Sequence, residues 1–268
     1  MSNLLLYKGK KRLCGYWPKD GIQSQNIFLK PSVPLNAGDA RALKFGMLEH
    51  GLLTNMEGGH FPICPDCPVS RACRNLRIDI GMFSLSRSDE RRLKLFTKDM
   101  EFSIEPAVFN GDYYALYKRY INARHGDTAT EMKNADQETY KRITLDMSAW
   151  QLVARDKQSK RLVSVAWVDQ HKRDFTLEYL AYDLENAKKS PGISSVLFLA
   201  HSLKTAGDRH LYLGSWSPGS PKLDYKQNFK GLEIHTPQGW VPFDRDRHAS
   251  APPVPGYRKT GMTFPSPG

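Results

Sequence analysis

A helix set between β-forming segments constrains the fold of this chain more than any other feature. The turn Ser190-Pro191-Gly192 opens an apolar helix that runs from Ile193 to about Lys204. Stretches rich in apolar and β-forming residues lie on both sides of it, at 150–155, 162–168, 175–182 and 210–214. Antiparallel strands, a helix entered through a tight turn and a returning strand together predict an α+β fold with a mixed sheet.

Two further helices are expected before these strands. Ser86 or Ser88 can cap a basic helix that carries Leu93, Phe96 and Met100 as its apolar stripe, and its basic face is either solvated or turned toward RNA. Asn110 can cap a second helix that ends near Arg124 and whose aromatic stripe is interpreted as core.

The net charge and the order of the segments limit the functions that this chain can have. The 268 residues carry a formal net charge of +11, which fits an anionic partner such as a phosphate backbone or a merely basic surface. No apolar run approaches the ~20 residues needed to span a bilayer, and the start lacks the features of a signal peptide, so we expect a cytoplasmic protein. We predict a cysteine-containing N-terminal domain over 1–105, a second domain over 106–244, and a flexible Pro- and Gly-rich tail over 245–268.

All four cysteines fall in the first of these regions. Cys64 and Cys67 form a Cys-x-x-Cys pair, Cys73 follows, and Cys14 lies far upstream. Such a pair can chelate one soft metal from a single turn, and the other two thiols would complete a set of sulfur ligands for zinc or an iron–sulfur cluster. Reduced structural or redox thiols are the alternative.

Several ordered segments resemble one known family. The matching segments are Leu211-Tyr-Leu-Gly-Ser-Trp-Ser-Pro-Gly-Ser-Pro-Lys-Leu-Asp-Tyr-Lys-Gln-Asn-Phe229, Tyr179-Leu-Ala-Tyr182-Asp183 with Lys189-Ser-Pro-Gly-Ile-Ser-Ser195, Phe83-Ser-Leu-Ser-Arg-Ser-Asp-Glu-Arg-Arg92, Tyr120-Ile-Asn-Ala-Arg-His-Gly-Asp127 and the cysteines. In this order they resemble the aminoacyl-tRNA–protein transferases, which comprise the arginyl-transferase type and the bacterial leucyl-transferases. Five residues separate Cys67 from Cys73, a longer gap than the family usually has.

The resemblance implies a fold and an activity. It implies a C-terminal half like the Gcn5-related acyltransferases (GNAT-like) and the transfer of leucine or arginine from a charged tRNA to an acceptor amine. By family analogy the acceptor is an N-terminal Asp or Glu of a protein marked for degradation. The same chemistry on a small-molecule or peptide amine is an alternative, as are an acetyl-coenzyme-A acyltransferase and an RNA-binding adaptor. No coenzyme A is expected, because the turn at 190–195 lacks the glycine pattern that holds its pyrophosphate.

Site residues follow from these segments. Asp183 is the first candidate for accepting a proton or orienting the amine. Alternatively, it has only a structural role and pairs with a neighbouring lysine or caps the next segment. Glu178 is the second candidate carboxylate. Tyr182 can donate a hydrogen bond to an oxyanion or stack on the terminal adenine of the tRNA, and the alternative is that it is a core residue. The residues expected to hold substrate and tRNA are Arg124, Ser190, Gly192, Ser194, Ser195, Lys222, Tyr225 and Lys226. His125 is added to Arg124 as a second cation at the helix end. Lys222, Tyr225 and Lys226 are expected to share one face of a short helix after the turn at 217–220. They would clamp the acceptor stem of the tRNA there, and a solvated helix face is the alternative.

Overall fold

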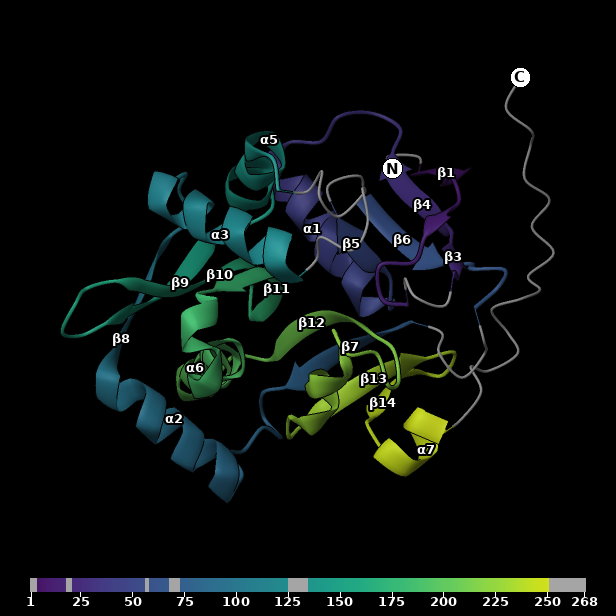
Figure 1. Ribbon diagram of the computed structural model, residues 1–268. Helices are drawn as coiled ribbons and strands as arrows, with labels where there is room; N and C mark the ends of the chain where they lie inside the picture. Colours follow the sequence, from purple (N-terminus) through teal and green to yellow (C-terminus); the bar gives the residue numbers. More distant parts are fainter. Residues whose placement is uncertain (1–3, 18–20, 56–57, 68–72, 125–134, 251–268) are drawn as a thin grey trace.

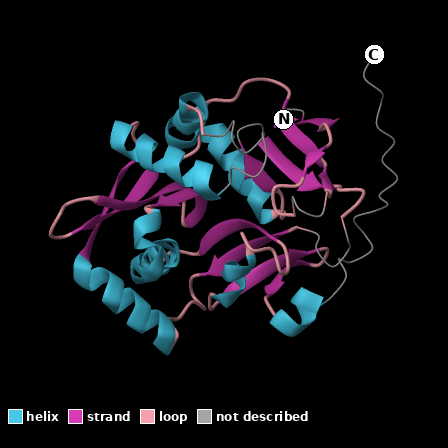
Figure 2. Ribbon diagram, in the orientation of Figure 1, coloured by secondary structure: helices cyan, strands magenta, loops and turns pink. Residues whose placement is uncertain are grey.

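The computed structural model describes residues 4–17, 21–55, 58–67, 73–124 and 135–250 (Figure 1). Within these ranges no helix combines the length and the hydrophobicity that crossing a bilayer requires. Figure 2 shows that strands form the centre of the molecule and that helices cover them on both sides.

The elements follow one another from a small sheet into a large one. The strands are β1 (Leu4–Lys8), β2 (Arg12–Leu13), β3 (Gln23–Ser24), β4 (Asn26–Pro31), β5 (Leu53–Asn55), β6 (Gly58–Pro62), β7 (Arg74–Asp79), β8 (Met100–Pro106), β9 (Trp150–Asp156), β10 (Leu162–His171), β11 (Asp174–Tyr182), β12 (His210–Trp216), β13 (Leu232–Thr236) and β14 (Gly239–Pro242). The helices are α1 (Ala37–Glu49), α2 (Arg87–Asp99), α3 (Gly111–Arg124), α5 (Gln137–Lys141), α6 (Pro191–Ala206) and α7 (Arg245–Ser250), with the π-helix η3 (Arg142–Asp146) and the 3₁₀ helices η4 (Leu184–Lys189) and η5 (Asp224–Asn228).

The large sheet has eight strands in the order β14-β13-β7-β12-β11-β10-β9-β8. Its described pairs are antiparallel except β11 with β12, which are parallel and are connected through α6. A parallel pair needs such a crossover, because a tight hairpin can join only antiparallel strands. The predicted α+β class with a mixed sheet is therefore confirmed, as are the strands that were expected around the apolar helix.

Local capping explains where the two earlier helices begin. Ser86 caps α2 and forms a capping box with Asp89, so that each satisfies a backbone N–H of the other. Asn110 accepts hydrogen bonds from the N–H groups of Asp112 and Tyr113 at the start of α3. Both predicted caps are thus confirmed.

The sheet separates two hydrophobic clusters. On one face α6 packs with Leu197, Ala200 and neighbouring side chains against strands of the sheet. On the other face α3 and α5 bury Tyr117 and Tyr140 against Trp167. The aromatic stripe of α3 lies largely in this second cluster, as expected for core.

Strands from both sides of residue 105 build the large sheet, since β7 lies between β12 and β13 and β8 forms the edge. The division of the chain into domains stays a prediction. Residues 245–250, expected to begin a flexible tail, form α7, and residues 251–268 lie outside the described part.

Candidate functional site

The large sheet opens between β11 and β12. These strands pair only from Asp174 opposite His210 to Thr176 opposite Tyr212, and beyond this point their ladder ends (Figure 1). Each strand is irregular just past that point: Glu178 is the extra residue against β10, and Leu213 is the extra residue against β7. Bulges re-aim side chains and end pairing, and they are common beside active sites. We therefore place the candidate site at this divergence.

Aromatic and basic side chains from distant segments meet at the end of β11. Arg124, at the end of α3, donates a hydrogen bond of 3.2 Å to the hydroxyl of Tyr182. The ring of Tyr120, also on α3, lies 4.8 Å from the ring of Tyr182 between centroids. Tyr225 on η5 is 37% exposed, but burial of its hydroxyl, with a smaller contribution from the neighbouring Tyr182, raises its pKa to about 12. We call Tyr120, Arg124, Tyr182 and Tyr225 the tyrosine–arginine cluster.

The surroundings keep Arg124 charged and the phenols of Tyr120 and Tyr225 neutral. Burial lowers the pKa of Arg124, but the hydroxyls of Tyr182 and Tyr120 more than offset this effect and raise it. Burial raises the pKa of Tyr120. A cationic donor and neutral O–H donors side by side can stabilise an oxyanion, and the rings can stack on a base.

The start of α6 abuts the same cluster. Ser190 has a left-handed backbone, and a Cβ on Gly192 would lie 3.2 Å from Cε1 of Tyr182, so the helix approaches that ring closely. The side chain of Ser194 is buried, and its Oγ has no hydrogen-bond partner in the described part of the chain. Ser195 instead lies 2.9 Å from Ser164 between their Oγ atoms and fixes α6 to β10. The structure thus brings Gly192 to Tyr182 and turns Ser195 inward.

The helix expected after Ser220 is shorter than predicted. Lys222 precedes η5, and only Tyr225 and Lys226 lie on it. Lys226 points inward, where its Nζ donates to the carbonyls of Leu213 and Ser215 at 2.7 Å each. Burial lowers the pKa of Lys226 to about 8. The expected common face of the three residues is therefore corrected: a 3₁₀ turn sends Tyr225 to Tyr182 and Lys226 to the bulge of β12.

Glu178 is enclosed between the sheet and α1. Its side chain is 4% exposed and lies 2.7 Å from the Nζ of Lys44, which also contacts Asp169 at 2.9 Å. Asp169 in turn contacts Arg41 at 2.9 Å. Burial raises the pKa of Glu178, although Lys44 opposes this effect. A buried carboxyl with a raised pKa is suited to proton transfer, but a role in holding α1 on the sheet accounts for the same contacts.

Asp183 lies directly after β11, and its side chain forms hydrogen bonds with nearby residues. Its side chain accepts a hydrogen bond from the backbone N–H of Glu185 and so caps η4. It also accepts from Asn186 and from Arg161, at 3.2 Å each. The catalytic role of Asp183 stays a prediction, and these contacts correspond to the cap that was its alternative.

All four cysteines lie in the described residues, and none of them forms a disulfide there. Burial raises the pKa of Cys73 to about 12, and the other three cysteines lie near enough to contribute to the rise. Burial raises the pKa of Cys64 as well. Metal ligands must lose the thiol proton, and no three His, Cys, Asp or Glu side chains are arranged to hold a metal ion within the described ranges. A zinc or iron–sulfur site stays a prediction.

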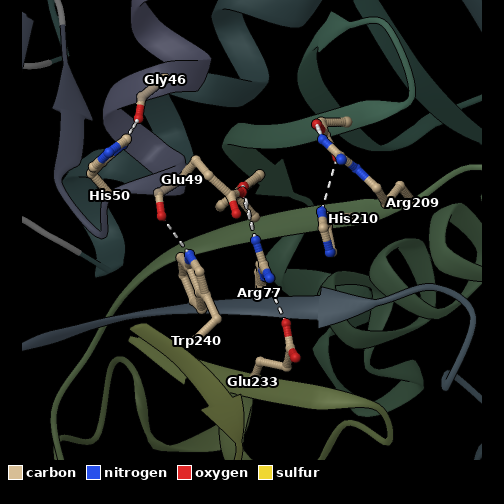
Figure 3. Close-up of polar contacts among 10 residues, drawn as sticks. Gly46, Glu49, His50, Arg77, Arg209, His210, Glu233 and Trp240 are labelled. Atoms are coloured by element: carbon tan, nitrogen blue, oxygen red, sulfur yellow. Dashed lines mark hydrogen bonds and ion pairs between the residues drawn. The ribbon is translucent and has the colours of Figure 1, made fainter. Parts of the chain in front are cut away.

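A second polar cluster joins α1 to the centre of the large sheet (Figure 3). Arg77 on β7 contacts Glu233 at 2.7 Å and Glu49 at 2.8 Å. Its guanidinium also lies 4.3 Å from the ring centre of Trp240, whose Nε1 donates to the Glu49 carbonyl. The hydroxyl of Tyr212 donates to Glu49 at 2.6 Å. The charges of Arg77, Glu49 and Glu233 are all paired, so this cluster positions α1 on the sheet and offers no charged group to a ligand.

Reasoning from the sequence missed Tyr120 and Lys44 as parts of the site. The helical spacing of Tyr120 indicated core, and no sequence signal links Lys44 to Glu178 across 134 residues. His125, which the sequence added to Arg124, lies outside the described residues.

Comparison with known proteins agrees with the ordered motifs. Residues 112–236 match the family model described as arginine-tRNA-protein transferase, C terminus. The chain is 30% identical over 240 residues to the aspartate/glutamate leucyltransferase of Dinoroseobacter shibae, covering 86% of this chain and 81% of that protein. It is 28% identical over 248 residues to the protein of the same name from Teredinibacter turnerae, covering 91% of this chain and 96% of that protein. This chain belongs to the aminoacyl-tRNA–protein transferase family.

Similarity to solved structures is weaker. The crystal structure of FemX has a TM-score of 0.39 at 11% identity and covers 81% of each chain. A tandem GNAT protein from the clavulanic acid biosynthesis pathway has a TM-score of 0.38 at 12% identity and covers 80% of this chain and 62% of that one.

Proposed function

We propose that this protein moves the leucyl group of Leu-tRNA to the N-terminal Asp or Glu of an acceptor protein in the cytoplasm. The observation that carries the proposal is the tyrosine–arginine cluster, which stands where β11 and β12 diverge and lies within the matched residues 112–236. The leucyl donor and the acidic acceptor are supported by the names of the relatives.

The reaction requires the protein mainly to position the two reactants. The acceptor amine forms a bond to the ester carbonyl carbon, the bond from that carbon to the terminal ribose oxygen of the tRNA breaks, and the proton lost by the amine balances the one gained by the ribose hydroxyl. Because the ester is already activated, no covalent enzyme intermediate is required. Positioning the two reactants and stabilising the transient oxyanion supply most of the acceleration.

We assign the oxyanion role to Arg124 and Tyr182. Arg124 stays charged at any working pH, and the hydroxyl of Tyr182 already accepts its hydrogen bond, which leaves the phenolic O–H to donate. Tyr225 and Tyr120 border this pair and offer rings on which the terminal adenine can stack.

The test uses purified protein, radiolabelled Leu-tRNA and Arg-tRNA, and peptides that begin with Asp, Glu or Lys. We expect label on the Asp and Glu peptides from Leu-tRNA only. Tyr182→Phe should lower kcat at least tenfold, as loss of an oxyanion donor does, with little change in tRNA affinity. Tyr114→Phe is the matched control, because its hydroxyl donates to the Ala135 carbonyl away from the cluster. Absence of label on every peptide while tRNA stays bound would refute protein transfer and favour a small acceptor or an adaptor.

The proton acceptor is tested separately. Asp183→Asn keeps an oxygen that can cap η4 but removes the charge. A loss of transfer much larger than the loss of tRNA binding would support Asp183 as base, whereas equal losses would assign it the cap alone. Glu178→Gln tests the second carboxylate by the same comparison.

A further inference from the structure

A basic depression of about 310 Å³ lies between α3 and the β9–β10 hairpin. Arg119 of α3 and Arg155, Lys160 and Arg161 of the β9–β10 hairpin line it, with two carboxylates, Asp112 and Asp183. We call these residues the basic pocket. Glu185 and Glu101 pair with Arg161 and Lys160 from just outside the lining, so the cations that make no ion pair in the described part of the chain are Arg119 and Arg155. These two guanidinium groups favour an anion.

The hairpin side of the pocket is rigid. Asp156 accepts hydrogen bonds from the backbone N–H groups of Gln158 and Ser159, and Lys160 sits in a left-handed conformation at the end of the turn. Arg155 donates to the Lys160 carbonyl, and its guanidinium lies 5.7 Å from the ring centre of Tyr113. The turn and Arg155 are therefore held in place before any ligand arrives.

The cations of the pocket remain available to a ligand. Arg119 is exposed, and the described part of the chain gives it no hydrogen bond or ion pair. Arg161 pairs with Asp183 and Glu185, and Lys160 pairs with Glu101, but the side chains of both cations are 64% exposed. Ion pairs this exposed contribute about 0.2–1 kcal/mol, so a phosphate can replace the carboxylates easily.

The pocket and the cluster share two elements. Asp183 in the pocket directly follows Tyr182 in the cluster. On α3, Arg119 lies one residue before Tyr120 and about 7.5 Å along the axis from Arg124. The two sites thus occupy neighbouring positions on α3 and at the end of β11. A single-stranded nucleic-acid segment whose last base meets the cluster can extend along α3 toward the pocket.

The surrounding charge favours an extended polyanion over a single acidic side chain. Lys189 pairs with Asp99, and Lys157 donates to the Thr97 carbonyl, so the end of α2 is tied to η4 and the hairpin. The turn between β9 and β10 lies on the side of the molecule that α2 and α3 also occupy (Figure 1). Lys157 and Lys189 therefore stand next to the end of α2, whose exposed Arg91, Lys94 and Lys98 add positive charge to this helix.

We propose that the basic pocket binds a backbone phosphate in the single-stranded 3′ end of the tRNA, just before the aminoacylated nucleotide. This inference rests on the proposed function and names the subsite that steers the ester to the cluster. Guanidinium groups suit the phosphate oxygens, because they donate in a fixed planar fork.

The experiment measures tRNA binding against salt concentration for the wild type, Arg119→Ala and Lys118→Ala. Lys118 is the matched control, because it is exposed on the same helix but does not line the pocket. We expect Arg119→Ala to weaken binding about tenfold, the scale of a lost hydrogen bond to a charged group, and to reduce the salt slope by about 0.7. With tRNA whose single-stranded 3′ end has been removed, wild type and Arg119→Ala should bind equally.

Three results would overturn the proposal. Equal losses in Lys118→Ala would show a diffuse basic field in place of a pocket. A remaining difference on the trimmed tRNA would place the contact elsewhere on the molecule. A raised KM for the acceptor peptide with unchanged tRNA affinity would assign the pocket to the acidic acceptor residue. Normal salt-dependent binding without any transfer would instead refute the proposed function and leave the phosphate contact standing.

Discussion

Replacing Lys44 by methionine should destabilise the protein in a way that acid reverses. Lys44 bridges Glu178 and Asp169, whose side chains are 4% and 3% exposed, at 2.7 and 2.9 Å. Methionine retains much of the volume of the stem and removes the charge. Asp169 keeps Arg41 as a partner, at 2.9 Å, but Glu178 is left as an uncompensated buried carboxylate.

The expected loss of stability depends on whether Glu178 stays ionised or takes up a proton in the variant. Removing one partner of a buried pair generally costs about 3–5 kcal/mol. The carboxyl can also escape by taking a proton, which from its ordinary pKa of 4.5 costs at most about 3.4 kcal/mol at pH 7. We therefore expect a loss of about 3 kcal/mol at pH 7, or roughly 6–12 °C in Tm.

The sign of the pH dependence is fixed by the same reasoning. In Lys44→Met the folded state holds a proton on Glu178 that the unfolded state releases above its ordinary pKa, so folding gains stability as the pH falls toward that value. At pH 5 the cost of protonation is only about 0.7 kcal/mol, and most of the loss in Tm should disappear.

Thermal melts at pH 7 and pH 5 test this prediction with Lys44→Met, Glu178→Gln and the double variant. Glu178→Gln removes the buried charge, so the double variant should recover most of the lost Tm at pH 7. A wild-type Tm for Lys44→Met, a loss as large at pH 5 as at pH 7, or a double variant no better than the single one would refute the reasoning.

Other expectations concern acid stability, the approach of α6 and the thiols. Hydrogen bonds from His210 and Arg209 outweigh the effect of burial and lower the pKa of Asp174 to about 2, so its contribution to stability should be present above pH 3.8 and be lost as the pH falls toward about 2. Acid melts of Asp174→Asn should lack that loss, and an unchanged acid limb would contradict it. Gly192→Ala brings a Cβ within 3.2 Å of the Tyr182 ring and should lower the transfer rate with little change in Tm, whereas full activity would show that the close approach is irrelevant. If the four cysteines hold a metal, elemental analysis of fresh protein will find zinc or iron and Cys67→Ser will lose it; unchanged metal content would exclude this ligand set.

Local signals in the sequence determined the apolar helix α6, the helices α2 and α3, and the strands β9 to β12. Ser86 and Asn110 cap helices where their spacing predicted, because a cap is decided by a side chain and the backbone a few residues away. The apolar helix after Ser190 and the strands on both sides of it follow from patterns of the same short range. The family, too, is carried by short ordered segments, and comparison with relatives confirms it.

Only the tertiary structure decided which of these residues meet. It places Arg124, Tyr182 and Tyr225 together although they come from α3, β11 and η5, and it adds Tyr120 to them. It also turns Lys226 inward and engages Asp183 in a cap, where residue types alone allowed a tRNA clamp and a base.

The physical reason lies in register and divergence. One extra residue in β11 and one in β12 shift which side chains face α1, and the end of their ladder sets where the sheet opens. Such irregularities depend on pairing with strands far away in the chain, so no local sequence pattern predicts them. The sequence by itself therefore determined the family and the helices and strands around α6, and the pairing of distant strands decided the site.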